Sequence, residues 1–322
     1  MRLDEKVFVV TGASSGIGTE TARALAARGA TVAIVGRSPA RTEATERSLR
    51  EGTGNERVHA FRADFASLEE VHRLADALLS RFDRLDGLIN NAGLWLRERR
   101  LSEDGHEMTL AVNHLAPFVL THRLLPRLLE SPGEARVVHV SSRLHEIAGR
   151  PRRLGWQLRH AGEVLGVLKR PRDARLDLSD PTLAIRYHGL DAYARSKLVQ
   201  ILFSNELARR LAGTRVTSNA VHPGDVATDV VRDSRFLSWG IRVVAPILKT
   251  PEEGAVTSVR VATDPALAGV TGRYFADERE ATPADVVHDR AAAREVWERS
   301  LAWTGLREDE LAEAVRDGSE SL

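Results

Sequence analysis

The chain has 322 residues, 43% of them hydrophobic, which is enough for the core of one large globular domain or two small ones. Its net charge of +1 gives no reason to expect a nucleic-acid partner, and the lack of cysteine excludes disulfides, thiolate catalysis and cysteine-ligated zinc. The eleven histidines form no His-Glu-x-x-His pattern, so no metal site is predicted. No apolar run approaches about 18 residues, and charged residues interrupt the N-terminus, so the simplest expectation is a cytoplasmic protein.

Short apolar runs alternate with amphipathic helical stretches up to about residue 222. Strands are predicted at residues 6–11, 31–35, 57–61, 86–90, 135–140 and 215–221, with a seventh near 273–275. Helices are predicted between them, for instance at 67–82 and 103–129. This alternation predicts an α/β fold, a Rossmann-type doubly wound parallel sheet with helices on both faces. No repeat or linker divides the chain, so residues 1–322 are predicted to form a single domain with a C-terminal helical extension at about 284–322.

The first strand runs directly into a glycine-rich turn and then into a helix predicted at residues 19–29. The turn reads Thr11-Gly12-Ala13-Ser14-Ser15-Gly16-Ile17-Gly18. Strand, glycine turn and helix in this order aim the amides of a helix N-terminus at a phosphate. Gly12 permits the tight turn, Gly16 lets the backbone approach a pyrophosphate, and Gly18 lets the helix pack closely on the strand. The spacing is neither Gly-x-Gly-x-x-Gly nor a P-loop, and it predicts a dinucleotide site.

The end of the second strand indicates which dinucleotide is bound. An NAD site usually places Asp or Glu here to bind the adenosine ribose hydroxyls, whereas this chain has Gly36 and then Arg37, with Arg41 close by. A guanidinium binds a 2′-phosphate through charge-assisted hydrogen bonds. Arg37 therefore predicts a preference for NADP(H), with NAD(H) as the alternative.

Three further side chains point to proton transfer. Tyr193 and Lys197 stand four residues apart on one face of a predicted helix, and the ammonium is expected to lower the phenol pKa from its ordinary value of about 10. Ser142 follows the strand at 135–140, so it lies at the carboxyl edge of the sheet, where such folds bind ligands. Its hydroxyl can orient a carbonyl oxygen toward Tyr193, and Ser141 is the alternative. No Gly-x-Ser-x-Gly accompanies it, which disfavours nucleophilic serine chemistry.

Together these motifs resemble the classical short-chain dehydrogenase/reductase (SDR) family over residues 1 to about 305. The resemblance rests on the glycine turn, Asn90-Asn91-Ala92-Gly93, Asn113, Ser141-Ser142, Tyr193-x-x-x-Lys197 and Pro223-Gly224. Within the family the chain is most similar to the retinol-dehydrogenase-like group, through Asn113-His114-Leu115-Ala116-Pro117-Phe118, Ala192-Tyr193-Ala194-Arg195-Ser196-Lys197-Leu198 and Val221-His222-Pro223-Gly224.

The resemblance implies roles for these residues. It identifies Ser142 as the catalytic serine, and it implies that Asn113 distorts its helix and holds a water near Lys197, which also binds the nicotinamide ribose. Cofactor contacts are implied for the glycine turn (Gly12, Ser14, Ser15, Gly16, Ile17, Gly18), Arg37, Asp64, Phe65, Asn91, Ala92, Gly93, Tyr193, Lys197, Pro223, Gly224, Val226 and Thr228. Ser15 departs from the pattern, because many NADP-preferring relatives carry a basic residue there.

The sequence thus predicts an NADP(H)-dependent oxidoreductase that interconverts a carbonyl and an alcohol on a lipophilic or bulky small molecule. Two alternatives stay open: a non-redox enzyme of the same fold, such as an isomerase, cyclase or dehydratase, and a non-catalytic nucleotide sensor. The sequence is compatible with a homo-oligomer and leaves the substrate undefined.

Residues 150–175 form a basic insertion, with eight basic and two acidic side chains, between the predicted catalytic serine and tyrosine. Its leucines recur with the period of an amphipathic helix. Three interpretations stay open: a surface excursion, a lid over the substrate pocket, and a helix that contacts a membrane surface.

Overall fold

A computed structural model describes residues 2–148, 176, 178, 180, 183–185, 187–226 and 249–309. The predicted insertion at 150–175 and residue Thr228 therefore lie outside the described residues, as do the last thirteen residues of the predicted C-terminal extension. Among the described residues, no helix is both long and apolar enough to cross a membrane.

Eight strands form one sheet in the order β3-β2-β1-β4-β5-β6-β7-β8. The strands are β1 (Val7–Thr11), β2 (Thr31–Gly36), β3 (Val58–Arg62), β4 (Gly87–Asn90), β5 (Ala135–Val140), β6 (Val216–His222), β7 (Tyr274–Ala276) and β8 (Arg279–Glu280). All neighbouring pairs are parallel except β7 and β8. The order reverses between β1 and β4, which makes the sheet doubly wound and confirms the predicted fold class.

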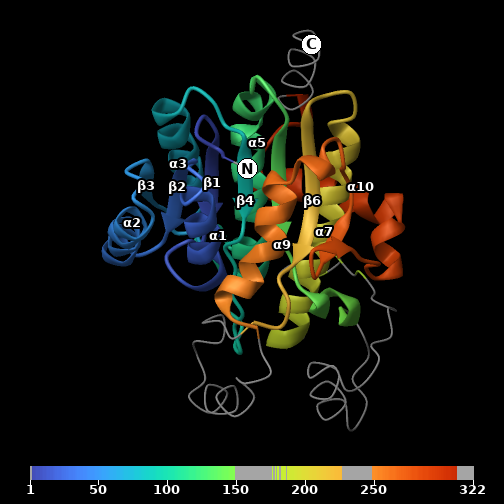
Figure 1. The fold of residues 1–322 in the computed structure, drawn as a ribbon. Helices are drawn as coiled ribbons and strands as arrows, with labels where there is room; N and C mark the ends of the chain where they lie inside the picture. The colour runs from blue at the N-terminus through green and yellow to red at the C-terminus, as the bar shows by residue number, and fades with distance from the viewer. Residues whose placement is uncertain are drawn as a thin grey trace.

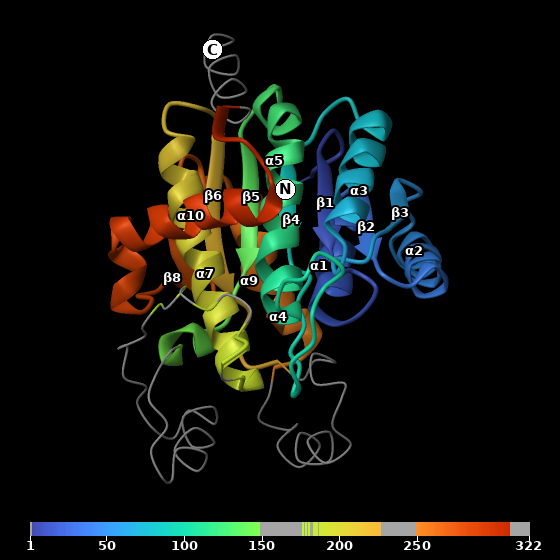
Figure 2. The same cartoon turned by 180° about the vertical axis from the view of Figure 1, so that it is seen from behind.

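Helices cover both faces of this sheet. They are α1 (Gly16–Ala26), α2 (Pro39–Thr53), α3 (Leu68–Arg81), α4 (Met108–Leu110), α5 (Ala116–Leu129), α7 (Gly189–Arg210), α9 (Pro251–Thr263) and α10 (Arg290–Thr304). Helices α1 and α9 lie side by side on one face (Figure 1), and α3, α5, α7 and α10 lie on the other (Figure 2).

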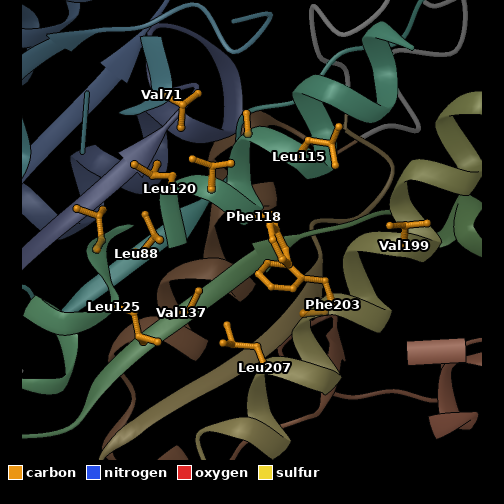
Figure 3. Close-up of a cluster of buried hydrophobic side chains, with 14 of the residues drawn as sticks. Val71, Leu88, Leu115, Phe118, Leu120, Leu125, Val137, Val199, Phe203 and Leu207 are labelled. Atoms are coloured by element: carbon orange, nitrogen blue, oxygen red, sulfur yellow. The ribbon is translucent and has the colours of Figure 1, made fainter. Parts of the chain in front are cut away.

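The larger hydrophobic core lies between the sheet and the helices α5 and α7. Phe118 of α5 and Phe203 of α7 meet over the sheet with their ring centroids 5.0 Å apart (Figure 3). Val137 of β5 and Leu88 of β4 line the sheet side of the same cluster. These apolar contacts fix α7 against the central strands, and α7 is the helix that carries Tyr193 and Lys197.

Two predicted helix boundaries and the number of strands differ from the structure. The helix predicted at 103–129 begins at Met108, because residues 103–105 form a turn in which Gly105 has a φ of +80°, and Glu107 caps the first helical amides. The first helix begins at Gly16 rather than at residue 19 and ends at Ala26. An eighth strand, β8, adds two exposed residues without an apolar pattern to the seven predicted strands.

Candidate active site

The glycine turn packs directly against the segment that follows β4. Gly12 has a φ of +65°, and a Cβ there would lie 2.7 Å from the Cα of Ala92. A Cβ on Gly18 would lie 2.5 Å from the carbonyl oxygen of Gly12 and from Nδ2 of Asn91. Neither position has room for a side chain, so both glycines are required for this close approach of the backbone.

Hydrogen bonds tie the two segments together. The Asn91 side chain donates to the carbonyl oxygen of Thr11 over 2.8 Å. In turn, Thr11 Oγ1 accepts from the backbone amides of Asn91 and Ala92, each at 3.0 Å. Thr11 is fully buried at the end of β1. The glycine turn and the segment Asn91 to Gly93 are called the cradle below. Its shape depends on Thr11, for which no role was predicted from the sequence.

The end of β2 borders the glycine turn. A Cβ on Gly36 would lie 2.2 Å from Thr42 Oγ1 and 3.0 Å from the Cβ of Ser14. The next side chain, Arg37, is exposed, and within the described part of the chain no acidic side chain forms an ion pair with it. Arg41 reaches back to the carbonyl oxygen of Ser14 at 3.5 Å. A positive edge thus lies beside the turn.

The remaining described cofactor candidates lie at the same carboxyl edge. Asp64 and the buried Phe65 follow β3, where Asp64 Oδ1 accepts from the amide of Ala66. Beyond β6, Pro223 precedes Gly224, whose φ is +93°. Two further candidates, Val226 and Ile17, border Gly254 of α9: a Cβ built there would lie 2.7 Å from Val226 and 3.1 Å from Ile17.

Asn113 lies in a π-helical turn, η1 (Ala111–Leu115), between α4 and α5. The wider turn accommodates a fully buried asparagine whose side chain holds the backbone of Leu94, accepting from its amide over 2.8 Å and donating to its carbonyl over 3.0 Å. The Nδ2 group also donates to Ser196 Oγ over 2.9 Å. The helix is therefore distorted at the residue where the family resemblance implied it.

Lys197 is buried beneath the same edge of the sheet. Its Nζ donates to the carbonyl oxygen of Val140 over 2.7 Å and to Oε1 of Gln200 over 3.3 Å. Burial lowers the pKa of Lys197 to about 7. A Cβ on Gly93 would lie 3.4 Å from Lys197 Nζ and 3.3 Å from Asn113 Oδ1. Asn113 and Lys197, which form a polar cluster, therefore meet the cradle at Gly93.

Tyr193 and Ser142 complete the cluster. Burial raises the pKa of Tyr193 to about 12, and a hydrogen bond with Ser142 opposes part of this shift. The Nζ of Lys197 lies 5.7 Å from the centroid of the Tyr193 ring. The pKa shift has the opposite direction to the one expected from the four-residue spacing, because loss of solvation dominates it.

The two neighbouring serines differ in what they contact. Ser141 is buried, and its hydroxyl donates to the carbonyl oxygen of Lys197 over 2.8 Å, which anchors β5 to α7. Ser142 is half-buried and caps the short 3₁₀ helix η2 (Arg143–Ile147), accepting from the amide of Leu144. Ser142, and not Ser141, contributes to the pKa of Tyr193 through a side-chain hydrogen bond, which favours Ser142 as the serine of the site.

Comparison with known proteins shows the family of the chain. A family model described as short chain dehydrogenase matches residues 6–150. Retinol dehydrogenase 12 of Bos taurus is 38% identical over 308 residues, covering 95% of this chain and 89% of that protein. The chain belongs to the short-chain dehydrogenase/reductase family. Within it, the chain falls in the retinol-dehydrogenase-like group, since human retinol dehydrogenase 11 is also 36% identical over 306 residues, 95% of this chain and 88% of that one.

Solved structures share the fold. A protein of uncharacterized function from Mycobacterium paratuberculosis superposes with a TM-score of 0.71 at 28% identity, covering 94% of this chain and 95% of that one. RhlG of Pseudomonas aeruginosa, solved in an active-site complex with NADP, gives a TM-score of 0.63 at 26% identity, covering 85% and 95%. The protein is thus a short-chain dehydrogenase/reductase that acts on CH–OH or C=O groups, and members of this family use NAD(P)(H).

The described residues of this SDR protein fit a dinucleotide. The turn is packed closely through Gly12 and Gly18, and α1 begins at Gly16 with its N-terminus at the carboxyl edge of the sheet, the arrangement that suits a phosphate. One residue of the polar cluster was missed by the sequence analysis. Ser196 accepts from Asn113 and donates to the carbonyl oxygen of Tyr193, and its place between Tyr193 and Lys197 was the only signal.

Proposed function

We propose that the protein is an NADP(H)-dependent carbonyl reductase and alcohol dehydrogenase in which Tyr193 is the general acid and base. The observation that carries the proposal is the meeting at Gly93 of Lys197 Nζ and Asn113 Oδ1, the two groups that a bound nicotinamide would adjoin. A sensor that only binds a nucleotide has no need of a buried amine, a buried amide and a phenol at this point.

The bound cofactor would supply or accept the hydride, and the protein supplies orientation and the proton. Ser142 would hydrogen-bond the substrate oxygen and hold it beside Tyr193, to which Ser142 is already bonded. Tyr193 would donate its proton to that oxygen during reduction and remove it during oxidation. Burial raises the pKa of Tyr193 to about 12, so the phenol carries the proton that reduction requires at pH 7.

Lys197 would then return a proton to Tyr193, and a water held near Asn113 would resupply Lys197. The Lys197 amine has a pKa of about 7, so at neutral pH it exchanges a proton without a large free-energy cost. The Asn113 side chain accepts from the amide of Leu94 and donates to Ser196 Oγ, and its Oδ1 faces Gly93. These contacts support a relay from Tyr193 through Lys197 toward a water held near Asn113.

The preference for NADP(H) is supported by Arg37. This exposed guanidinium stands one residue beyond Gly36, where an NAD site would carry an acidic side chain, and Arg41 lies on the same edge. A doubly charged 2′-phosphate would gain charge-assisted bonds there and meet no carboxylate. Structural relatives that were solved with NADP point the same way.

The substrate is proposed to be a lipophilic or bulky aldehyde or ketone, in line with the retinol dehydrogenases among the relatives. The test follows NADPH consumption with all-trans-retinal, a medium-chain aldehyde and a cyclic ketone, with NADH as the matched cofactor control. We expect turnover with at least one carbonyl and a clear preference for NADPH. Tight NADPH binding without consumption with any of them contradicts redox catalysis, and equal use of NADH contradicts the role of Arg37.

A further inference from the structure

We propose that His145 is a positioning residue for Ser142. Its ring connects this serine to residues 284–288, called the C-terminal segment below, which are bonded to α7. The inference rests on the proposed role of Ser142. His145 belongs to η2, three residues after Ser142, and its ring is fully buried. Neither the family resemblance nor the proposed chemistry gave this histidine a role.

Both ring nitrogens of His145 have assigned partners. Its Nδ1 lies 2.7 Å from the carbonyl oxygen of Ser142, which can only accept, so Nδ1 carries the proton. Its Nε2 lies 3.0 Å from the backbone amide of Ala284, which can only donate, so Nε2 is the acceptor. The contacts therefore require the neutral ring in a single tautomer, the one protonated at Nδ1.

The amide of Ala284 is a firm anchor for this bond. Ala284 is fully buried and immediately precedes η6 (Asp285–His288), where the Val287 carbonyl accepts from Nδ2 of Asn205 over 3.1 Å. Asn205 lies on α7, twelve residues beyond Tyr193. A chain of bonds thus leads from Ser142 through His145 and the C-terminal segment back to the helix that carries Tyr193.

Other contacts hold the neighbours of Ser142, while its carbonyl oxygen accepts both from the backbone amide of His145, over 3.1 Å, and from ring Nδ1. Ser141 is bonded through its hydroxyl to the Lys197 carbonyl, and the Arg143 amide donates to Nδ1 of His222. The ring of His145 also packs edge-on against Tyr274 of β7, with centroids 5.2 Å apart. Because the ring cannot turn without losing these contacts, it fixes the direction in which η2 leaves the strand, and with it the Ser142 hydroxyl.

Two substitutions separate the two bonds. In His145→Asn the amide nitrogen replaces Nδ1 and keeps the bond to Ser142, whereas in His145→Gln the amide oxygen replaces Nε2 and keeps the bond to Ala284. His288→Gln, at an exposed histidine of the same C-terminal segment, is the matched control. Each variant is assayed as the full chain with NADPH and all-trans-retinal, at a temperature where melting curves show that it is folded.

If His145 positions Ser142, kcat falls by roughly 10- to 100-fold in His145→Gln, the scale expected for a misplaced active-site group, while the KM for NADPH is unchanged. In His145→Asn, kcat stays within about threefold of wild type. Amide hydrogen exchange at Leu144, whose N–H donates to Ser142 Oγ, quickens only in His145→Gln. Equal effects of both variants on kcat and on Leu144 exchange overturn the proposal.

The tautomer provides a readout that needs neither a variant nor a substrate. Nitrogen-15 spectra of the histidine-labelled wild-type protein should show His145 protonated at Nδ1 and unprotonated at Nε2, and the opposite tautomer overturns the proposal. If the wild-type protein reduces no carbonyl, the proposed function fails. The tautomer and the Leu144 exchange then still decide whether His145 holds Ser142.

Discussion

The two halves of the carboxyl edge of the sheet, one around β1 to β4 and one around β5 and α7, are built in different ways. Around β1 to β4 the cradle is made mostly of backbone, with Gly12 and Gly18 allowing close approach and Thr11 binding the backbone of the next turn. Around β5 and α7 the site is made of buried polar side chains, among them Lys197, whose pKa is lowered by burial to about 7. In the proposed function, shape serves binding in the first half, and desolvated ionisable groups serve chemistry in the second.

Acid should therefore weaken the half of the molecule that carries the buried ionisable groups. Burial lowers the pKa of His114 and His139 to about 3 and that of His122 to about 4, from an ordinary 6.5. Since the unfolded chain then binds more protons, stability is complete above pH 6.5 and falls as the pH drops toward the folded values. At pH 5 the loss is about 2 kcal/mol for each histidine.

Urea unfolding at pH 7.5 and pH 5 measures this loss. His139→Leu should reduce the difference between the two pH values by about 2 kcal/mol, because one neutral buried imidazole is removed. His288→Leu, at an exposed site, should leave the difference unchanged. A pH dependence that is the same in both variants contradicts the assignment of acid sensitivity to this cluster.

The cradle should be sensitive to shape rather than to pH. Gly12→Ala places a methyl group 2.7 Å from the Cα of Ala92 at a φ of +65°, so we expect about 2–4 kcal/mol of lost stability or a comparable loss of NADPH affinity. Gly54→Ala has nearly the same φ, +66°, with no atom within 4 Å, and is the matched control. Calorimetry of both variants separates strain from contact, and equal effects contradict the close approach.

A positive charge borders the glycine turn beside Gly36, where Arg37 is exposed. Arg37→Asp should weaken NADPH binding about 100-fold, through loss of a charge-assisted contact and new repulsion, while NADH binding changes little. Arg47→Asp, an equal change of charge at an exposed site on α2, should leave the ratio of the two affinities near wild type. A parallel loss of both cofactors in Arg37→Asp contradicts phosphate recognition by this side chain.

Much of this arrangement could be predicted from the sequence. The ends of seven strands fall within one residue of their predictions, because parallel strands buried on both faces are continuous apolar runs. The positions of Asn113, Ser142, Tyr193 and Lys197 at one edge followed from motifs in chain order. What the sequence could not give is burial, and burial raises the pKa of Tyr193 where the spacing alone predicted that it falls.

The missed residues share a physical reason. Thr11 and His145 bond to backbone groups of segments that are distant in sequence, and Ser196 bonds to a backbone carbonyl of its own helix. A small polar residue at the end of a strand or inside a helix has many ordinary roles, so its type and spacing do not reveal such a bond. Likewise β8 pairs two exposed residues that carry no apolar signal.

The smallest expected effect concerns ionisation of the phenol. In the protein without cofactor, Tyr193 should stay protonated up to pH 10, because its pKa is about 12. The measurement is the phenolate absorbance of the wild-type protein minus that of Tyr193→Phe as the pH rises. A difference that appears between pH 7 and pH 9 shows instead that Lys197 already lowers the phenol pKa, and the contrast between the two halves then weakens.

The most direct test of the whole account measures kcat and the NADPH dissociation constant together in Tyr193→Phe. If binding resides in the cradle and chemistry in the α7 cluster, carbonyl reduction should fall by at least about 100-fold, the usual contribution of a general acid. NADPH affinity should stay within about threefold of wild type, because the phenol hydroxyl is no part of the glycine cradle. Near-wild-type turnover in this variant, or a loss of NADPH affinity as large as the loss of turnover, contradicts the account.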